Sequence, residues 1–500
     1  MITLKCRSCG SKYVTSNELP IYGCKNRYTD KDISHILEKY ISPMAIPFIK
    51  ENIGEIIKLN KGSQNPFIAY KNIFFSYYLS KYLKVDFNNV IDEINNNLKS
   101  INGFGFSETP LLQPYKLQDF CKLVTDDDID IHIKNETGNV SGSHKSRHLM
   151  GNIIYFDVLY RGKIFKDKPK LAIYSCGNAA MAAAIVAKAA NYELNTYIPP
   201  NVNKNVFDYL NSFDANVITC PRQPNQDGDP CYIKFQEAIT NNTAIPFSCS
   251  GIDNWSNIEG GQTLCLEYIS QLLKRNITLD GIVIQIGGGA LASSAIKTLN
   301  DLFELKIINK IPKIYAVQTR GGFPLIRAYY LIIKKISNLY NLKCSLTYDK
   351  KANYREQNKN ILDYMTTYVE EIKNIANFCK EHYNSHVIKN ILNEILQDDK
   401  VNNYMWSWED EPKSIAHGIL DDITYDWIAI IHGMLKTGGL PIIIDEDDII
   451  NTNIKAKKVT NIKVDYTGSS GLSGLIKLYQ LGFFTKELKN IATIFTGIER

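Results

Sequence analysis

Short apolar strands alternate with amphipathic helices over residues 128–320, and this alternation constrains the fold more than any other feature of the chain. The expected strands cover residues 129–133, 171–174, 195–198, 216–219, 281–286 and 313–318. The expected helices cover residues 179–190, 205–212, 255–274 and 291–302. Because helices join successive strands, the strands must run parallel, which predicts an α/β fold with right-handed crossovers.

The remaining segments are arranged around this pattern. Five hundred residues are too many for one simple core, so two or three domains are expected. We expect an N-terminal extension at 1–104, an α/β core at 105–323 and 401–500 with a smaller lobe at about 146–250, and a helical insertion at 324–400. A further strand is expected at 440–444 and a closing segment at 464–478. Helical spacing of apolar residues predicts that residues 30–100 are helical.

The composition excludes several classes of protein. The hydrophobic fraction of 44%, the charged fraction of 22% and the net charge of +5 are those of an ordinary globular chain. No block of like charge suggests a nucleic-acid partner, and no apolar run reaches the roughly 18 residues of a membrane span. The start of the chain lacks an apolar signal region, and the eleven cysteines are irregularly spaced. We therefore expect a cytoplasmic protein that binds neither nucleic acid nor membrane.

The N-terminal cysteines allow two interpretations. Cys6-x-x-Cys9-Gly10 is followed by Cys24, but the second cysteine pair of a zinc ribbon is missing. The three cysteines could form a degenerate zinc knuckle. Alternatively, they are a metal-free remnant with buried thiols. No metal is expected in the catalytic core.

A lysine lies in a turn of small residues, Ser141-Gly142-Ser143-His144-Lys145-Ser146-Arg147, just after the first expected strand. Small residues let another molecule approach the backbone closely. A lysine held in such a pocket can act as an amine nucleophile. Taken alone, the segment is better explained as a surface loop, so a catalytic role for the lysine depends on the other turns of the core.

Two further turns join an expected strand to an expected helix. Residues 175–180 read Ser-Cys-Gly-Asn-Ala-Ala, and the free N–H groups of such a helix start can bind a carboxylate. Residues 287–291 read Gly-Gly-Gly-Ala-Leu, and three glycines let consecutive N–H groups surround a phosphate. The second turn is neither a Walker A loop nor a GxGxxG fingerprint. Either turn could also be an ordinary cap or a packing requirement.

The fourth segment, residues 465–472, reads Asp-Tyr-Thr-Gly-Ser-Ser-Gly-Leu. The hydroxyl of Thr467 could donate a hydrogen bond to a ring nitrogen, although hydroxyl-rich helix caps look the same. Together and in this order, the four segments resemble the fold type II family of pyridoxal-phosphate enzymes, the group of threonine synthase, serine/threonine ammonia-lyase, cysteine synthase and the tryptophan synthase β chain. Residues 135–147 are similar to the family's K-x-E-x-x-N-P-T-G-S-F-K-D-R, although His144 and Ser146 depart from it.

The resemblance implies two parallel-sheet α/β domains, pyridoxal 5′-phosphate as cofactor and a role for each segment. Lys145 forms the Schiff base with the cofactor. The cofactor-binding residues are Lys145, Asn178, Gly287, Gly288, Gly289, Ala290, Leu291 and Thr467, with Ser469 as the alternative to Thr467. The residues that receive the substrate carboxylate are Ser175, Cys176 and Ala179. Family members are commonly dimers, so the resemblance implies a possible homodimer, and the sequence itself leaves the oligomeric state open.

Within the family, the chain looks most like threonine synthase-like proteins, on the Cys6-x-x-Cys9-Gly10 start and the segment Glu108-Thr109-Pro110-Leu111-Leu112. This implies a lyase-type elimination and replacement on a small amino acid, with O-phosphohomoserine converted to threonine. A serine/threonine ammonia-lyase and a β-replacement synthase are the alternatives. A different class, a pseudoenzyme or assembly protein, would use the extension and the insertion to bind a partner.

Overall fold

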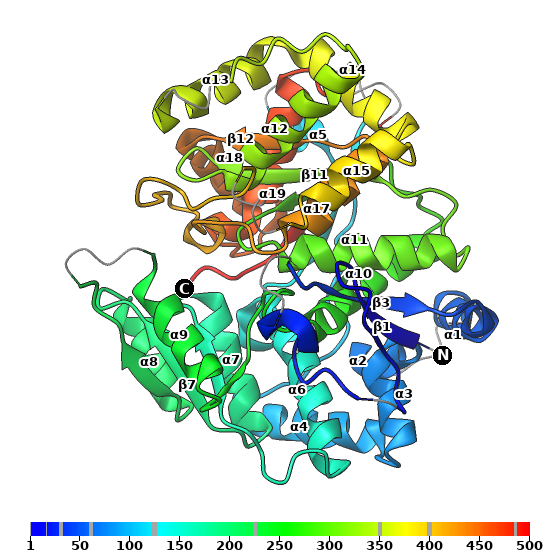
Figure 1. Ribbon diagram of the computed structural model, residues 1–500, viewed down its shortest axis with the longest axis vertical. Coiled ribbons are helices and arrows are strands. Elements are labelled where there is room, and N and C mark those ends of the chain that lie inside the picture. Colours follow the sequence, from blue (N-terminus) through cyan, green and yellow to red (C-terminus); the bar gives the residue numbers. More distant parts are fainter. Residues whose placement is uncertain are drawn as a thin grey trace.

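The computed structural model describes residues 2–16, 18–29, 34–59, 64–121, 128–223, 228–348, 353–397, 403–484 and 488–500. The described chain builds three sheets (Figure 1). The largest contains β4 (Tyr115–Lys116), β5 (Asp130–Asn135), β10 (Gly281–Gln285), β11 (Lys313–Thr319), β12 (Pro441–Ile444) and β13 (Asn490–Phe495). The second contains β6 (Leu171–Tyr174), β7 (Leu194–Ile198), β8 (Asn216–Thr219) and β9 (Ile245–Pro246). The N-terminal sheet contains β1 (Ile2–Cys6), β2 (Lys12–Tyr13) and β3 (Leu37–Ile41).

Helices connect and cover these sheets. In the first quarter of the chain they are α1 (Ile46–Leu59), α2 (Pro66–Ala69), α3 (Phe75–Tyr82), α4 (Phe87–Asn102) and α5 (Leu117–Phe120). The middle of the chain adds α6 (Lys145–Arg161), α7 (Asn178–Ala189), α8 (Lys204–Ser212), α9 (Pro230–Thr240), α10 (Ser256–Lys274), α11 (Ala290–Glu304) and α12 (Pro324–Leu339). The remaining ones are α13 (Tyr354–Thr367), α14 (Val369–Glu381), α15 (His386–Glu394), α17 (Trp427–Thr437), α18 (Glu446–Thr460) and α19 (Tyr466–Gln480).

The two larger sheets confirm the predicted parallel α/β architecture. The six-stranded sheet has the order β12-β11-β10-β13-β5-β4, and every pair in it is parallel except β4 with β5. The four-stranded sheet has the order β8-β7-β6-β9 and is parallel throughout. In α/β proteins, ligands bind at the carboxyl ends of parallel strands. The turns at residues 175–180 and 287–291 lie at such ends, after β6 and β10.

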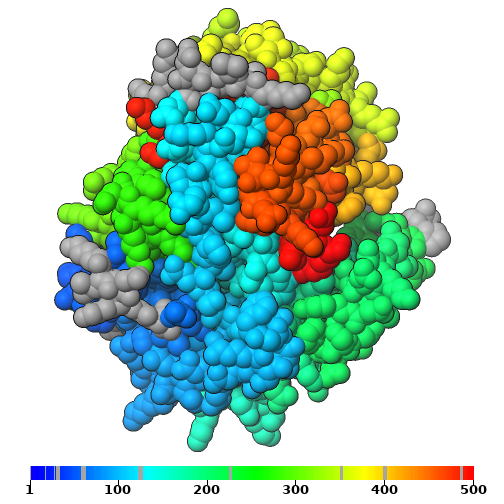
Figure 2. Space-filling model, turned by 180° about the vertical axis from the view of Figure 1, so that it is seen from behind, coloured from blue at the N-terminus to red at the C-terminus, as the bar shows by residue number. Residues whose placement is uncertain are grey.

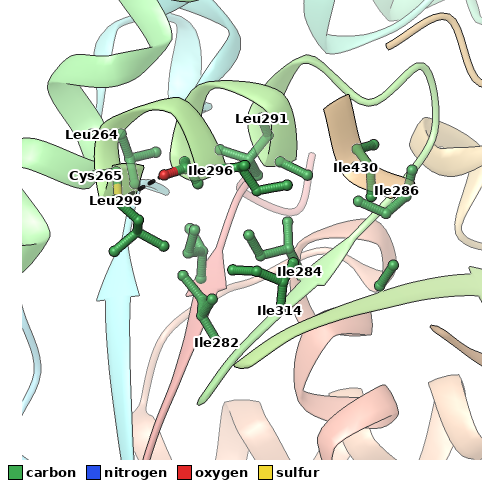
Figure 3. Close-up of a cluster of buried hydrophobic side chains, with 14 of the residues drawn as sticks. Leu264, Cys265, Ile282, Ile284, Ile286, Leu291, Ile296, Leu299, Ile314 and Ile430 are labelled. Carbon is green, nitrogen blue, oxygen red and sulfur yellow. Dashed lines mark hydrogen bonds between the residues drawn. The ribbon is translucent and has the colours of Figure 1, made fainter. Parts of the chain in front are cut away.

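The core of the larger lobe lies where helices pack on the central strands (Figure 3). The side chains of Leu291, Ile296 and Leu299 on α11 face Ile282 and Ile284 on β10. All of these side chains are buried. Strands buried on both faces are largely apolar, which explains why β12 and the first four residues of β10 read as continuous apolar runs.

The prediction that residues 30–100 are helical is wrong at its start. Residues 37–41 form β3, which pairs antiparallel with β1 in the register Cys6↔Leu37 to Ile2↔Ile41. The backbone N–H and C=O groups of this segment pair with those of β1. This tertiary pairing overrides a helical spacing of apolar residues that extends over only eight residues. Helices α1 to α4 then follow as predicted.

The described part of residues 324–397 contains helices α12 to α15 and no strand, in agreement with the predicted absence of a strand pattern. Figure 1 shows α13 and α14 at the upper edge of the larger lobe, away from the four-stranded sheet. Among the described helices of the chain, none combines the length and the apolar character that a membrane crossing needs.

Candidate active site

Lys145 is the first residue of α6 and is half-buried. It is reached through a 3₁₀ turn, Val140–Gly142, that follows β5. Gly142 has a φ of +64°, and a Cβ atom there would lie 2.5 Å from a side-chain carbon of Ile498. The next residue, Ser143, forms a β-bridge with Gly497, two residues after the end of β13. The small residues of the turn therefore allow the C-terminal segment to pack directly against the lysine turn.

A buried cluster of balanced charges holds the start of α6 in place. The Arg147 guanidinium donates to both carboxylate oxygens of Glu136, at 2.8 and 3.0 Å, and to Glu267 at 3.1 Å. Lys134 Nζ lies 2.5 Å from the same Glu267 carboxylate. Burial alone would raise the pKa of Glu267, but the charges of Arg147 and Lys134 outweigh it and hold the pKa at about 2. The arginine that follows the lysine in the motif is therefore a fixed anchor two residues from Lys145.

The glycine turn lies between β10 and α11, and it begins at the carboxyl end of a central strand. Gly289 has a φ of +98°, a conformation that favours glycine, and α11 starts at Ala290 without a side-chain cap. The first N–H groups of a helix lack partners within the helix and carry its positive dipole end. The segment from Gly287 to Leu291 thus has the local structure of an anion site.

The corresponding turn of the four-stranded sheet lies between β6 and α7. Helix α7 begins at Asn178, and no side chain caps its first turn. Ser175 and Ala179 are half-buried, and Cys176 is exposed. The side-chain oxygen of Asn178 accepts a hydrogen bond from the Arg500 guanidinium, which also donates to the carbonyl oxygen of Ser141. This arginine therefore ties the second turn to the lysine turn.

Thr467 lies in the first turn of α19, where its hydroxyl oxygen accepts a hydrogen bond of 3.0 Å from the N–H group of Gly418. Because the oxygen accepts this bond, the hydroxyl hydrogen can point at an external acceptor. The alternative, Ser469, is fully buried, and its hydroxyl oxygen accepts from Asn453 at 2.9 Å. Of the two hydroxyls, that of Thr467 is better placed to meet a ligand.

Direct contacts bring these segments together. Gln285, the last residue of β10, donates to the carbonyl oxygens of Thr467 and Gly468 at 3.1 and 3.0 Å, so the glycine turn and the start of α19 are adjacent. Figure 1 marks the C-terminus between the larger lobe and the lobe of α7 to α9, and Figure 2 shows the red C-terminal residues at the same junction from behind. The four segments therefore converge between the two parallel sheets.

Two carboxylates in this region were missed in the sequence. Burial raises the pKa of Asp421 to about 6 and that of Asp426 to about 7, and the neighbouring Lys145 charge only partly opposes this. Asp426 accepts hydrogen bonds from the N–H group of Gly251 at 2.9 and 3.1 Å. These aspartates follow the long helical segment in the chain, so no local motif links them to Lys145.

Asp421 lies directly against the glycine turn. One of its carboxylate oxygens is 2.6 Å from where a Cβ atom on Gly287 would be, and the N–H group of Gly288 donates to the carboxylate. The absence of a side chain at Gly287 therefore makes room for a carboxylate in this structure. An ionised Asp421 would repel an anion at the same turn, whereas a protonated Asp421 would not.

The two histidines near the lysine are structural. His144 Nδ1 lies 3.2 Å from the carbonyl oxygen of Thr496, and His148 Nδ1 lies 3.1 Å from that of Asn257. Burial, together with the Lys145 charge, lowers the pKa of His144 well below its usual range and that of His148 to about 3. Both imidazoles are therefore neutral at physiological pH.

The geometry as a whole defines a class of protein. A helix-initial lysine lies between two parallel sheets, with an uncapped glycine turn on one and an uncapped helix start on the other, and this is the architecture of a fold type II pyridoxal-phosphate enzyme. The sequence model of the family described as "Pyridoxal-phosphate dependent enzyme" matches residues 104–368, just over half of the chain. The chain belongs to this family, and its cofactor is pyridoxal 5′-phosphate.

Solved structures of known proteins share this fold. A pyridoxal 5′-phosphate-dependent aspartate racemase is 15% identical with a TM-score of 0.52, and the match covers 83% of this chain and 95% of that one. Maize serine racemase is 16% identical with a TM-score of 0.51, covering 82% and 93%. Isoform 2 of threonine deaminase from Solanum lycopersicum is 12% identical with a TM-score of 0.51, covering 83% and 90%. At such low identity these likenesses show the fold alone. No curated protein sequence matches the chain significantly.

The residues present fit the cofactor of the family. The uncapped start of α11 offers backbone N–H groups to a phosphate, and Thr467 offers a hydroxyl hydrogen to a ring nitrogen. Lys145 is half-buried, so its amine can meet a ligand between the sheets. Asp421 opposes the phosphate when it is ionised.

Proposed function

We propose that the protein catalyses a pyridoxal-phosphate-dependent elimination or replacement on the side chain of a small amino acid. The observation that carries this proposal is the hydroxyl of Thr467, which accepts from Gly418 and keeps its hydrogen for a ring nitrogen. When bound, the cofactor supplies an electron sink for negative charge at the substrate Cα. A neutral hydroxyl partner leaves the ring nitrogen unprotonated, which weakens this sink and suits elimination better than transamination.

The proposal assigns roles to the residues of the site. Lys145 would hold the cofactor covalently and, once its amine is free, would move the proton at the substrate Cα. Asn178 would contact the 3′ oxygen of the ring. The phosphate would bind to Gly287, Gly288, Gly289, Ala290 and Leu291, and the substrate carboxylate to Ser175, Cys176 and Ala179.

The finer proposal is a threonine synthase-like reaction on O-phosphohomoserine. Such a substrate needs a second cationic group for its own phosphate. Arg500 supports it, because its guanidinium contacts both Asn178 and the carbonyl of Ser141. A guanidinium between the lysine turn and the start of α7 could therefore meet a substrate anion.

A second candidate is a serine/threonine ammonia-lyase, and the carboxylates favour it. Asp421 and Asp426 lie near enough to Lys145 for its charge to act on both of their pKa values. Carboxylates near the reacting centre disfavour a doubly charged leaving group such as phosphate. An uncharged hydroxyl leaving group carries no such penalty.

Product analysis separates the candidates. The full-length protein, saturated with pyridoxal phosphate, would be incubated separately with O-phosphohomoserine, L-threonine and L-serine. Phosphate release with formation of threonine would support the threonine synthase-like reaction, and 2-oxo acid release from threonine or serine would support the lyase. Lys145→Ala should abolish either product, whereas Lys234→Ala, a substitution of an exposed lysine, should leave it unchanged.

Two outcomes would contradict the proposal. The first is racemisation without 2-oxo acid or phosphate, detected by chiral chromatography of the amino acids. The second is a protein that binds the cofactor yet leaves all three substrates intact, which would favour the pseudoenzyme or assembly class. The absence of yellow colour after adding pyridoxal phosphate would remove the assigned cofactor role of Lys145 itself.

A further inference from the structure

Four side chains with metal-binding atoms meet in the N-terminal sheet, outside the candidate active site. The Sγ atoms of Cys6, Cys9 and Cys24 and a ring nitrogen of His35 all lie within 4.8 Å of one another. All three cysteines are free thiols in this structure. The residues come from three places in the chain: the hairpin of β1 and β2, the segment before the 3₁₀ turn Lys25–Tyr28, and the approach to β3.

Two separations in this group match tetrahedral coordination of zinc, and the others lie within 4.8 Å. Zinc bonds of about 2.3 Å to sulfur and about 2.05 Å to nitrogen require separations of about 3.8 Å between two sulfurs and about 3.6 Å between sulfur and nitrogen. The Sγ atoms of Cys9 and Cys24 are 3.6 Å apart, and Cys6 Sγ lies 3.5 Å from His35 Nδ1. A disulfide would instead bring two sulfurs to about 2.05 Å. The observed distances therefore fit a shared ion better than a bond between two cysteines.

The backbone of the hairpin presents the first two sulfurs in one direction. The N–H group of Gly10 donates to the carbonyl of Cys6 at 3.1 Å, and the N–H group of Cys6 donates to Ser11 at 2.8 Å. Gly10 has a φ of +73°, which closes the turn after Cys9 and which residues with a side chain rarely adopt. The glycine after the second cysteine is thus required by the geometry that brings Cys6 and Cys9 together.

Neutral donors surround two of the sulfurs. The hydroxyl of Tyr13 donates to Cys24 Sγ at 3.3 Å, and the side-chain amide of Asn26 donates to Cys9 Sγ at 3.5 Å. Such outer contacts orient metal ligands and stabilise thiolates. Cys6, Cys24 and Tyr13 are buried, so the centre is shielded from solvent on that side.

We propose that Cys6, Cys9, Cys24 and His35 bind one zinc ion as a closed structural site. Four protein ligands leave no position for water or substrate, which is the pattern of a structural rather than a catalytic zinc. Thiolates with one imidazole select zinc among the common divalent ions, in contrast to the oxygen ligands preferred by magnesium and calcium.

The site would fix a loop that supports the catalytic core. Between Tyr13 and Cys24, the carbonyl of Pro20 accepts from the Tyr155 hydroxyl of α6 at 2.7 Å, and the carbonyl of Tyr22 accepts from the N–H group of Trp255 at 3.1 Å. Zinc bound to Cys9 and Cys24 would therefore fasten the chain on either side of residues 20–22, which rest on α6 and beside the start of α10. These two helices also contribute Arg147 and Glu267 to the buried charge cluster near Lys145.

Metal analysis of the full-length chain tests the proposal. Protein purified without chelators should contain about one zinc ion per chain, measured by mass spectrometry of the metal. Cys9→Ser and Cys24→Ser should lose this zinc. Cys344→Ser, which changes a half-buried cysteine elsewhere in the chain, should keep it. Removal of zinc should make residues 18–24 more sensitive to limited proteolysis.

A second variant keeps the test valid even if the serine variants do not fold. His35→Cys replaces the imidazole with a fourth thiolate, so the protein should retain zinc. After exchange for cobalt, the visible spectrum should show a tetrahedral site with more sulfur ligation than the unmodified chain. Protein that neither contains nor takes up zinc would overturn the proposal, as would a cobalt spectrum unaffected by His35→Cys. A Cys9–Cys24 disulfide in a non-reducing peptide map would also overturn it.

Discussion

The charged cluster around Arg147 and the carboxylates Asp421 and Asp426 both bury ionisable groups near Lys145, but they are built in opposite ways. In the first, two carboxylates face two cations at hydrogen-bond distance, and the pKa of Glu267 falls to about 2. In the second, the carboxylates accept N–H groups of glycines, and burial raises their pKa values to about 6 and about 7. The same chemical group is thus a permanent anion in one place and a titrating group in the other.

This difference gives the two groups different roles: one fixes the local structure, and the other changes its charge with pH. A fully paired cluster keeps one arrangement at all physiological pH values, so it fixes the start of α6. Carboxylates with pKa values near neutrality change their charge in the working range, so they can alter the field at Lys145 and at the glycine turn. Substitutions that disturb one group without the other test this division of roles.

Breaking the paired cluster should have the largest effect. Arg147→Met leaves Glu136 buried without its bidentate partner, and we expect the free energy of unfolding to fall by about 3–5 kcal/mol. Denaturant titration of the full-length chain measures this. Arg355→Met is the matched control, because its ion pair with Asp410 is exposed to solvent and its loss should lower the free energy of unfolding far less. An equal decrease in the free energy of unfolding for the two variants would show that the buried cluster does not anchor the start of α6.

Asp426 should make stability depend on pH. Its pKa rises from 3.8 in the unfolded chain to about 7 in the folded one, so folding takes up a proton between these values. The free energy of unfolding should therefore fall as the pH rises from about 4 to about 7, by on the order of 2–4 kcal/mol. Asp426→Asn should reduce this dependence and leave the part due to Asp421, whose pKa is also raised, as measured by denaturant titration at several pH values.

The control for this prediction is Asp208→Asn, because Asp208 is exposed on α8. Its substitution should leave the pH profile unchanged. A profile for Asp426→Asn that parallels the unmodified chain between pH 4 and pH 7 would contradict the raised pKa.

The sequence revealed the fold and the four turns because each depends on local residues. The glycines of Gly287–Gly289 and the apolar run of β10 are local signals, and they predicted the parallel sheet and the position of the glycine turn. Asp421 and Asp426 could not be found in the same way. They lie more than a hundred residues after the glycine turn and reach it only through the fold.

His35 was missed for a related physical reason. Residues 33–40 were interpreted as helical, which would have left no reason to place this histidine near the cysteines. In the structure, β3 pairs with β1 in the register Cys6↔Leu37, and this pairing brings His35 beside Cys6. A fourth ligand that arrives through strand pairing leaves no spacing signature in the sequence. The three-cysteine motif therefore looked incomplete.

Asp421 should weaken cofactor binding as the pH rises. At pH 8 the Asp421 carboxyl group is ionised, and because it lies beside the glycine turn, its charge would repel a phosphate bound there. Asp421→Asn should bind pyridoxal phosphate about tenfold more tightly at pH 8, since a like charge removed nearby changes the binding energy by about 1–2 kcal/mol. The gain should shrink towards pH 5, where Asp421 is protonated. Fluorescence titration with pyridoxal phosphate at pH 8 and at pH 5 measures the affinity of the variant and of the unmodified chain.

The neighbouring residue provides the control. Asp422→Asn removes a half-buried carboxylate for which the described contacts show no bond to the glycine turn, so its effect on affinity should be smaller. An equal gain in affinity for the two variants would mean that only net charge matters. No gain at all for Asp421→Asn would mean that the carboxylate moves away before the cofactor binds.

The smallest effect is expected at His144, although it is adjacent to Lys145 and departs from the family motif. Its imidazole is neutral because burial lowers its pKa, and its Nδ1 contact to the Thr496 carbonyl is duplicated by its own backbone N–H at 3.0 Å. His144→Phe should therefore change stability by about 1 kcal/mol or less, and kcat should stay within a few-fold of the unmodified enzyme. A much larger loss of kcat with unchanged stability would show that His144 takes part in proton transfer. It would then belong with the titrating carboxylates rather than with the fixed groups around Arg147.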